Sequence, residues 1–122
     1  MLNDDDLNRY ARQVIIPNFE EDGQENLLNT KCLIVGAGGL GCPVALYASA
    51  AGFGHIEIYD EDIIEISNLN RQIAHKNDHI GNNKAENLVE ECLKINPNIS
   101  IISKKNIFDE TIDVSNFDLI FD

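Results

Sequence analysis

The sequence predicts an α/β domain built on a parallel sheet with flanking helices. Short apolar runs alternate with longer segments whose apolar residues recur at helical spacing. The run at 32–35, CLIV, has no polar alternation, as expected for a strand buried on both faces of a parallel sheet. The expected strands are residues 31–35, 55–60, 99–103 and 117–122, and the expected helices between them are residues 40–51 and 84–95. This order indicates a Rossmann-like fold.

The chain is expected to divide into an N-terminal helical segment, residues 1–30, and a Rossmann-like portion, residues 31–122. Within the first part, residues 4–16 have apolar side chains at three- and four-residue spacing and predict one helix, and residues 23–28 predict a second, short one. The sequence ends at Asp122, before the loop that such a strand usually delivers to a ligand crevice. We therefore expect an incomplete domain, an N-terminal fragment that is inactive by itself.

Composition excludes several classes of function. The 122 residues include 9 Lys and Arg against 21 Asp and Glu, a net charge of −12, which argues against general binding to nucleic acid or an anionic membrane. Neither a long apolar run nor a secretory signal is present, so we expect a cytoplasmic protein. The three cysteines are isolated and form no C-x-x-C pair, so they predict buried free thiols instead of a zinc site.

A glycine-rich loop predicts a nucleotide site. Gly36, Gly38 and Gly41 match G-x-G-x-x-G, with Gly39 inside the motif, between an expected strand and an expected helix. Glycines let the backbone approach a phosphate, and a helix N-terminus offers unpaired N–H groups. Asp60 follows nineteen residues after Gly41, where a carboxylate can accept hydrogen bonds from ribose hydroxyls. The loop fits NAD and the adenosine of ATP equally well, and no G-K-S/T sequence follows it, which excludes a P-loop.

The segment after the second expected strand resembles a known family. Residues 60–72, DEDIIEISNLNRQ, look like the D-x-D-x-[IV]-x-x-S-N-L-x-R-Q signature of the MoeB/ThiF/HesA family, which the adenylation domains of ubiquitin-activating enzymes share. Residues 9–13 resemble its R-Y-x-R-Q, residues 23–25 its G-Q-E, residues 80–84 its I-G-x-x-K and residues 95–97 its I-N-P. The resemblance extends from the first of these motifs to the end of the chain.

The resemblance implies an enzyme. Members of this family use ATP to adenylate the C-terminal glycine carboxylate of a ubiquitin-like sulfur-carrier protein of the MoaD/ThiS type, giving an acyl-adenylate and pyrophosphate. The pathway would be molybdopterin synthesis, thiamine synthesis or tRNA thiolation, and a peptide substrate also remains open. The implied cofactors are ATP and Mg²⁺, and the implied assembly is a homodimer. The family's magnesium-binding Asp and its zinc-binding C-x-x-C pairs would lie beyond Asp122, so no residue is assigned to a metal.

The resemblance also implies roles for single residues. Gly39 would lie against the nucleotide and Asp60 would hold the ribose. Arg71 and Lys84 would offset the charge of the phosphoryl oxygens, and Arg12 would reach the active site of the neighbouring subunit. The stretch that wraps the phosphates would be Ser67, Asn68, Leu69, Asn70 and Arg71. These roles suit phosphoryl transfer, which needs positioning and positive charge. The alternative for Arg71 and Lys84 is an ordinary ion pair, and for Arg12 a solvated position on a helix.

Two other functions compete with this interpretation. A fragment of an NAD-dependent dehydrogenase would explain the glycine-rich loop and Asp60, but not residues 67–72 or Lys84. A non-catalytic partner subunit of a heterodimeric activating enzyme would be free to lose Arg71 or Lys84, and this sequence has both. The three histidines share no spacing with a carboxylate or cysteine, so they are expected to be structural or solvated.

Overall fold

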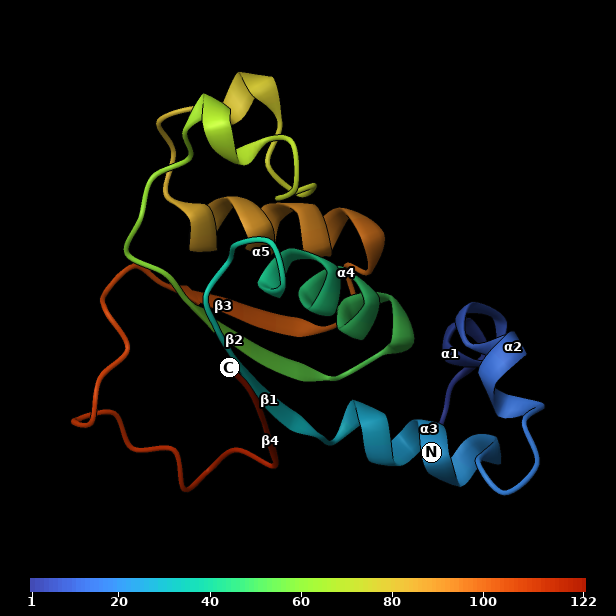
Figure 1. The fold of residues 1–122 in the computed structure, drawn as a ribbon. Helices are drawn as coiled ribbons and strands as arrows, with labels where there is room; N and C mark the ends of the chain where they lie inside the picture. Colours follow the sequence, from blue (N-terminus) through green and yellow to red (C-terminus); the bar gives the residue numbers. More distant parts are fainter.

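The computed structural model describes all 122 residues and consists of a parallel sheet, two long helices and an N-terminal helical segment (Figure 1). The four-stranded sheet has the order β3-β2-β1-β4, and each neighbouring pair is parallel. The strands are β1 (Lys31–Val35), β2 (His55–Tyr59), β3 (Ser100–Lys104) and β4 (Leu119–Phe121). The predicted fold class and the parallel sheet are therefore confirmed.

The two long helices, α4 (Gly41–Ala51) and α5 (Lys84–Ile95), cover one face of the sheet (Figure 1). Alternate residues of the central strands point toward them and form the core with small and apolar helix residues. This core includes Cys32, Ile34, Ile56, Ile58, Ala45, Ala48, Leu88 and Cys92. Small side chains let α4 lie close to the strands. None of the helices is both long and apolar enough to span a bilayer.

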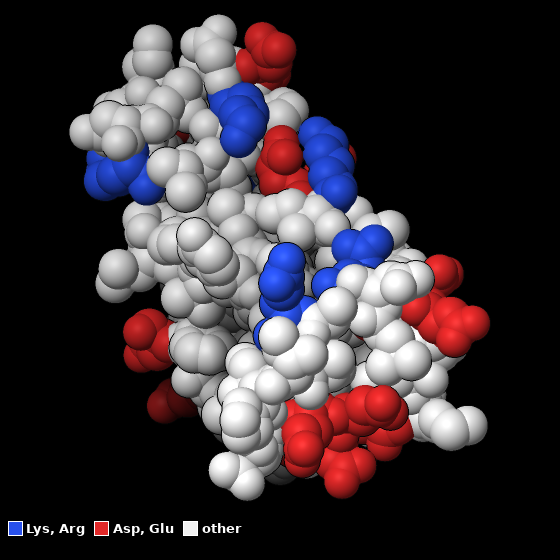
Figure 2. Space-filling view, turned by 90° about the vertical axis from the view of Figure 1, so that its right-hand side faces the viewer, with Lys and Arg blue, Asp and Glu red and all other residues white.

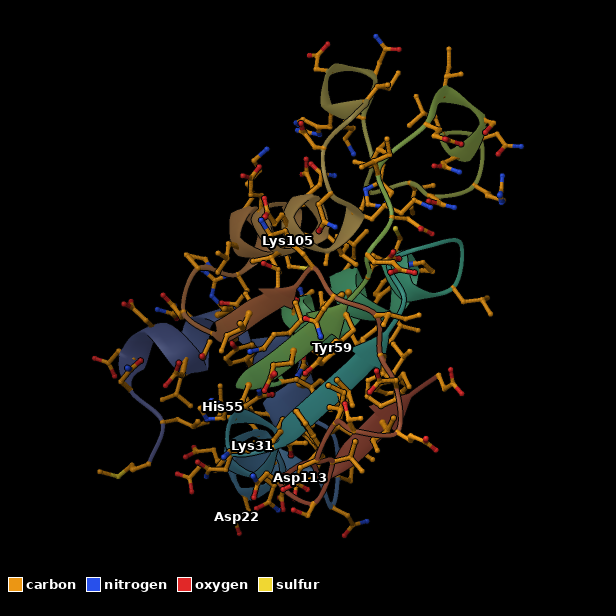
Figure 3. The ribbon with its side chains drawn as sticks, turned by 90° about the vertical axis from the view of Figure 1, so that its left-hand side faces the viewer. Asp22, Lys31, His55, Tyr59, Lys105 and Asp113 are labelled. Carbon is orange, nitrogen blue, oxygen red and sulfur yellow. The ribbon has the colours of Figure 1, made fainter.

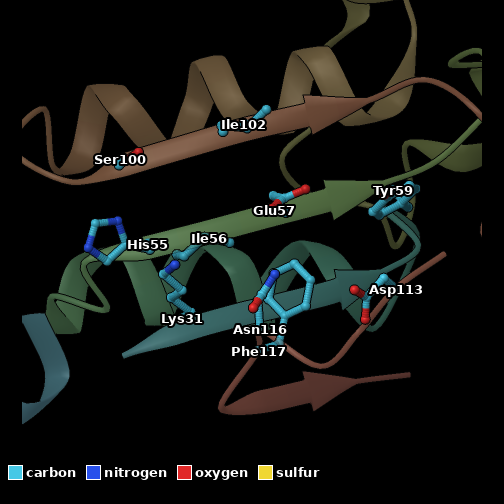
Figure 4. A pocket seen from close by; sticks show the side chains of 10 residues that line it. All are labelled: Lys31, His55, Ile56, Glu57, Tyr59, Ser100, Ile102, Asp113, Asn116 and Phe117. Atoms are coloured by element: carbon cyan, nitrogen blue, oxygen red, sulfur yellow. The ribbon is translucent and has the colours of Figure 1, made fainter. Parts of the chain in front are cut away.

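No helix covers the opposite face of the sheet, which the segment between β3 and β4 crosses instead. Lys31, His55 and Tyr59 lie on the two central strands, and Asp113 lies on the crossing segment (Figure 3). Phe108 of this segment packs edge-on against Tyr59, with ring centroids 5.4 Å apart and an interplanar angle of 72°. A hollow of about 290 Å³ remains between the segment and the strands, and α4 and α5 lie behind the sheet in this view (Figure 4).

The N-terminal helix expected over residues 4–16 is wrong as a single element. The structure has α1 (Asp4–Arg9) and α2 (Ala11–Val14), separated at Tyr10, whose backbone has φ −103° and ψ 19°. Tyr10 is only 1% exposed, and its hydroxyl accepts a hydrogen bond of 2.8 Å from Asn96 Nδ2. The break lies at the residue that makes this long-range bond. The contact between Tyr10 and Asn96 takes precedence over the helical spacing of the neighbouring residues.

The third helix, α3 (Glu20–Leu28), begins three residues earlier than the stretch expected at 23–28. Its first turn holds Glu20, Glu21 and Asp22, and acidic side chains favour a helix N-terminus. Together with the acidic first turn of α1, they account for much of the negative charge near the N-terminus. Figure 2 shows the largest group of Asp and Glu side chains in the lower part of that view, where the N-terminal helices face the viewer.

Buried and half-buried polar side chains attach the N-terminal segment to the helices that cover the sheet. Gln13 Nε2 donates to Gln24 Oε1 (2.6 Å) and to the carbonyl of Ala51 (2.9 Å), and Gln24 Nε2 donates to the same carbonyl (3.0 Å). Asn96 Nδ2 donates both to Tyr10 and to the carbonyl of Ser49. The motifs R-Y-x-R-Q, G-Q-E and I-N-P thus meet at the C-terminal ends of α4 and α5.

We expect Tyr10→Phe to lower the free energy of unfolding by about 1–3 kcal/mol, because it leaves a buried Asn96 N–H without an acceptor. Urea denaturation of the two proteins measures the difference. Tyr47→Phe is the matched control, since Tyr47 is 78% exposed and its loss of a hydroxyl should have almost no effect. Equal stabilities for the two variants would contradict a structural role for the bond.

Candidate functional site

The glycine-rich loop connects β1 to α4 at the carboxyl edge of the sheet. Gly36 has φ +97°, in the left-handed region that favours glycine. A Cβ at Gly41 would overlap the carbonyl oxygen of Gly36, so this position also requires glycine. A Cβ at Gly38 or Gly39 would make only ordinary van der Waals contacts. The turn itself therefore depends on the first and last glycines of the motif.

The loop presents a row of unpartnered backbone N–H groups. The N–H groups of Gly38, Gly39, Leu40 and Gly41 have no hydrogen-bond acceptor, whereas Cys42 N–H donates to the Gly38 carbonyl (3.0 Å). They stand at the N-terminus of α4, where the helix dipole adds partial positive charge. This arrangement suits a phosphate group.

Asp60 holds the loop from the end of β2. Its Oδ2 accepts a hydrogen bond from Ala37 N–H (2.8 Å), and its Oδ1 accepts one from Asp62 N–H (2.9 Å). The structure thus places this carboxylate beside the glycine-rich loop, and its contact with ribose stays a prediction. Each oxygen retains acceptor capacity, so its hydrogen bonds to the backbone are compatible with the predicted contact to ribose.

Lys84 is a buried cation without a partner. It is the first residue of α5 and only 8% exposed, yet it makes no ion pair. It lines a cavity of about 310 Å³ together with Asp62, Ile63, Glu65 and Asn68. Burying an unpaired charge is costly, so this ammonium is suited to an anionic ligand. The ordinary ion pair considered as an alternative is absent.

Arg71 lies beside the glycine-rich loop. A Cβ at Gly39 would be 3.7 Å from Arg71 Cγ, so the stem of this side chain packs against the loop. Its Nη1 donates to the Ser67 carbonyl (3.0 Å) and to Asn70 Oδ1 (3.1 Å), and it pairs with no carboxylate. The guanidinium is exposed and retains further donors for a ligand.

The stretch from Ser67 to Asn70 forms a turn around the 3-10 helix η1 (Ile66–Asn68). Asn68 is 8% exposed, and its Oδ1 accepts a hydrogen bond from Glu65 N–H (2.9 Å). Leu69 is half-buried. In the structure this stretch orients Arg71 and lines the polar cavity; its contact with phosphates stays a prediction.

Two further neutral side chains, His75 and Asn87, belong to the site, and no role in it was predicted for them from the sequence. His75 Nε2 lies 2.7 Å from the Ala37 carbonyl oxygen, and His75 Nδ1 lies 2.9 Å from Asn87 Nδ2. Both residues are buried, His75 at 3% and Asn87 at 2% exposed. Burial lowers the pKa of His75, which favours the neutral ring. Local spacing gave no signal, because the bonded groups lie 12 and 38 residues apart.

A second hollow adjoins the loop where the strand order reverses. The chain moves outward from β1 to β2 and β3 on one side and to β4 on the other, so the crevice expected for a ligand lies at the carboxyl ends of β1 and β4. A hollow of about 420 Å³ lies there. It is lined by Ile34, Val35, Leu40, Gly41, Val44, Ile120, Phe121 and Asp122. The end of the loop, at Leu40 and Gly41, thus lines a largely apolar hollow.

Arg12 is the one candidate residue that the structure does not bring to this site. It is exposed on α2 and makes no ion pair or side-chain hydrogen bond. The neighbouring Gln13 contacts Ala51, the last residue of α4, whereas the glycine-rich loop precedes the first residue of that helix. An 11-residue helix is about 16.5 Å long, so Arg12 lies far from the loop of its own chain.

Residues 10–122 match the model of the ThiF family. The chain belongs to the ThiF family. It is 42% identical to the adenylyltransferase and sulfurtransferase UBA4 of Scheffersomyces stipitis, over 97% of this chain and 28% of that protein. The family resemblance is therefore confirmed, and the dehydrogenase alternative loses its basis.

Two solved structures share the fold at appreciable identity. Escherichia coli MccB in a structure with ATP has a TM-score of 0.69 and 40% identity, covering 72% of this chain and 26% of that chain. The E. coli tRNA N6-threonylcarbamoyladenosine dehydratase TcdA in complex with AMP has a TM-score of 0.80 and 26% identity, covering 88% of this chain and 43% of that chain. The chain therefore spans less than half the length of each of these proteins.

Proposed function

We propose that the full-length protein uses ATP to adenylate a substrate carboxylate, namely the C-terminal glycine carboxylate of a ubiquitin-like sulfur-carrier protein of the MoaD/ThiS type. The observation that carries this proposal is a set of donors available to a ligand: the buried Lys84, which makes no ion pair, the free N–H groups of the loop, and Arg71, which pairs with no carboxylate. Such a set of donors suits a triphosphate. The adenylyltransferase UBA4 and the ATP complex of MccB support the choice of ATP over NAD.

Each group has a defined part in the proposed reaction. The N–H groups of residues 38–41 bind phosphate oxygens, and Asp60 accepts hydrogen bonds from the ribose. A carboxylate oxygen of the carrier attacks the α-phosphorus, the bond to the β-phosphate oxygen breaks, and pyrophosphate leaves. Arg71 and Lys84 stabilise the charge that develops on the phosphoryl oxygens. Positioning and charge are the main contributions that a protein makes to phosphoryl transfer.

Mg²⁺ bound together with the triphosphate fits this proposal. Mg²⁺ in nucleotide sites is usually held by one or two carboxylates together with the phosphates. The chain has no group of three His, Cys, Asp or Glu residues that could hold a metal by itself, but Asp62 and Glu65 line the cavity next to Lys84. When bound, the ion would offset part of the negative charge of the triphosphate.

A protein carrier suits this chain better than a nucleic-acid substrate. The net charge of −12 disfavours RNA, which is the molecule named for TcdA. The carrier could serve molybdopterin synthesis, thiamine synthesis or tRNA thiolation. The presence of both Arg71 and Lys84 favours a catalytic subunit over a silent partner.

Carrier-dependent ATP–pyrophosphate exchange tests the proposed function. We expect the full-length protein to incorporate labelled pyrophosphate into ATP when a carrier with a free C-terminal glycine is present. The same carrier with an amidated C-terminus should give no exchange, because its nucleophile is blocked. Exchange that persists with the amidated carrier, or that is absent with every carrier of a representative panel, would contradict the proposal.

We further propose a homodimer in which Arg12 acts on the neighbouring active site. Its distance from the loop of its own chain and its lack of partners favour action between subunits. Mixing Arg12→Ala protein with Lys84→Ala protein should restore exchange to about a quarter of the wild-type level, because heterodimers are about half of the dimers and have one intact site each.

The matched control for this mixing experiment is Arg71→Ala with Lys84→Ala. Both residues belong to the same site of one chain, so no intact site forms and no activity should return. Subunit exchange is verified with differently tagged proteins. If the Arg12 mixture stays as inactive as this control although subunits exchange, Arg12 does not act between subunits.

A further inference from the structure

The backbone of Ala37, in the middle of the glycine-rich loop, is held on both sides by side chains. Its N–H donates to Asp60 Oδ2 at 2.8 Å, and its carbonyl oxygen lies 2.7 Å from His75 Nε2. The thiol of Cys42 is a weaker neighbour, at 3.5 Å from the same carbonyl oxygen. Asp60 comes from β2 and His75 from the segment before α5, so two separate parts of the fold determine the position of this loop.

The hydrogen bonds around Asn87 determine which nitrogen of His75 carries the proton. Asn87 Nδ2 lies 3.1 Å from the Ala74 carbonyl, which can only accept, so the atom facing it is the amide nitrogen. The same NH₂ group faces His75 Nδ1 at 2.9 Å. His75 Nδ1 therefore accepts, and the ring proton is on Nε2, where it donates to the Ala37 carbonyl.

This bond affects the N–H groups that would bind phosphate. In a continuous helix the Ala37 carbonyl would be the acceptor for the N–H of Gly41, four residues later. In the structure the carbonyl accepts from His75, and the Gly41 N–H has no partner. One residue further along, the regular bond from Cys42 N–H to the Gly38 carbonyl is present.

We propose that His75, oriented by Asn87, is a positioning residue for the nucleotide: its Nε2–H holds the Ala37 carbonyl so that the N–H groups of residues 38–41 point at the phosphates. His75 does not itself touch the ligand in this account. The nucleotide-binding part of the inference rests on the proposed function, whereas the loop geometry does not.

Acid should weaken this arrangement. Protonation of the ring would place an N–H on Nδ1 against the NH₂ group of Asn87, so two donors would face each other. The charged and titratable groups around the ring are Cys42, Asp60, Lys84 and His79. Burial lowers the pKa of His75, and Lys84 and His79 act in the same direction, whereas the hydrogen bond to the Ala37 carbonyl and the charge of Asp60 act to raise it. A lowered pKa means that the stability contributed by the neutral ring is present above the unfolded value of 6.5 and is lost as pH falls through the folded value.

The first experiment compares His75→Gln with His75→Leu. Gln has an amide nitrogen near the position of Nε2 and retains a donor, whereas Leu fills similar space without one. Isothermal titration of the full-length proteins with ATP should give a Kd raised about tenfold for His75→Leu and less than about threefold for His75→Gln, the range for one hydrogen bond. Between pH 7.5 and 5.5 the wild-type affinity should fall more than that of His75→Gln. Equal affinities for His75→Leu and wild type would overturn the proposal.

The second experiment does not use ATP, and its first measurement uses the wild-type protein alone. In the nucleotide-free wild-type protein, ¹⁵N NMR should show His75 as the neutral Nε2–H tautomer, and a proton on Nδ1 would overturn the proposal. Hydrogen exchange of the Ala37 and Cys42 amides should be faster in His75→Leu than in His75→Gln. If these loop results hold but wild-type protein does not bind ATP, the structural role of His75 stands and the proposed function fails.

Discussion

Lys84→Ala is expected to lower carrier-dependent ATP–pyrophosphate exchange by at least about a hundredfold, the scale for loss of one preorganised contact to a transition state. Lys84 is suited to this role because the residue is buried, makes no ion pair and lines the polar cavity. Because most of this side chain is buried, water is expected to screen its charge less than that of an exposed lysine. Arg71→Ala should lower exchange on the same scale, since its stem packs on Gly39 and its guanidinium has free donors.

Lys76→Ala is the matched control for this prediction. Lys76 lies in the segment before α5, eight residues before Lys84, but is exposed, and its Nζ donates to the Ile73 carbonyl (3.0 Å). The control should retain exchange within about twofold, because an exposed charge interacts weakly with its surroundings. Thermal denaturation of all three variants checks that the loss of exchange is not unfolding. Wild-type exchange in folded Lys84→Ala protein would remove Lys84 from the mechanism.

The parts of the fold that the sequence predicted well are those whose signal is local. The strands at 31–35 and 55–59 and the helix at 84–95 have continuous or periodic apolar residues, which burial in a parallel sheet requires. The break at Tyr10 was missed because its cause is a bond to Asn96, 86 residues away. Helical spacing on both sides of Tyr10 is intact, so no local pattern could reveal it.

The candidate site divides in the same way. Gly36 and Gly41 were recognisable because a tight strand-to-helix turn demands glycine within six residues of sequence. The burial of Lys84 was not foreseen, since it depends on how α5 begins against the segment from Asp62 to Asn68. His75 and Asn87 are ordinary residues in a polar stretch. Their importance appears only in the folded structure, where Asn87 lies against His75 and His75 lies against Ala37 of the glycine-rich loop.

Gly41→Ala should have the largest effect on the nucleotide site among single methyl additions in the loop. The added Cβ would overlap the carbonyl oxygen of Gly36, and both partners are backbone, so no side chain can rotate away. Relief requires the start of α4 to move from β1, which disturbs the row of N–H groups at residues 38–41 together with the adjoining core residue Ile34. We expect a loss of about 3 kcal/mol or more in the free energy of unfolding, at the upper end for overpacking, and no measurable ATP binding.

Gly38→Ala is the matched control, because its Cβ would lie 3.6 Å from Gln72 Nε2, an ordinary contact, and its backbone has no positive φ. This control should lose less than about 1 kcal/mol. Urea denaturation and ATP titration of both variants decide the matter: if Gly41→Ala is as stable as Gly38→Ala and binds ATP like wild type, the turn does not depend on glycine at its last position.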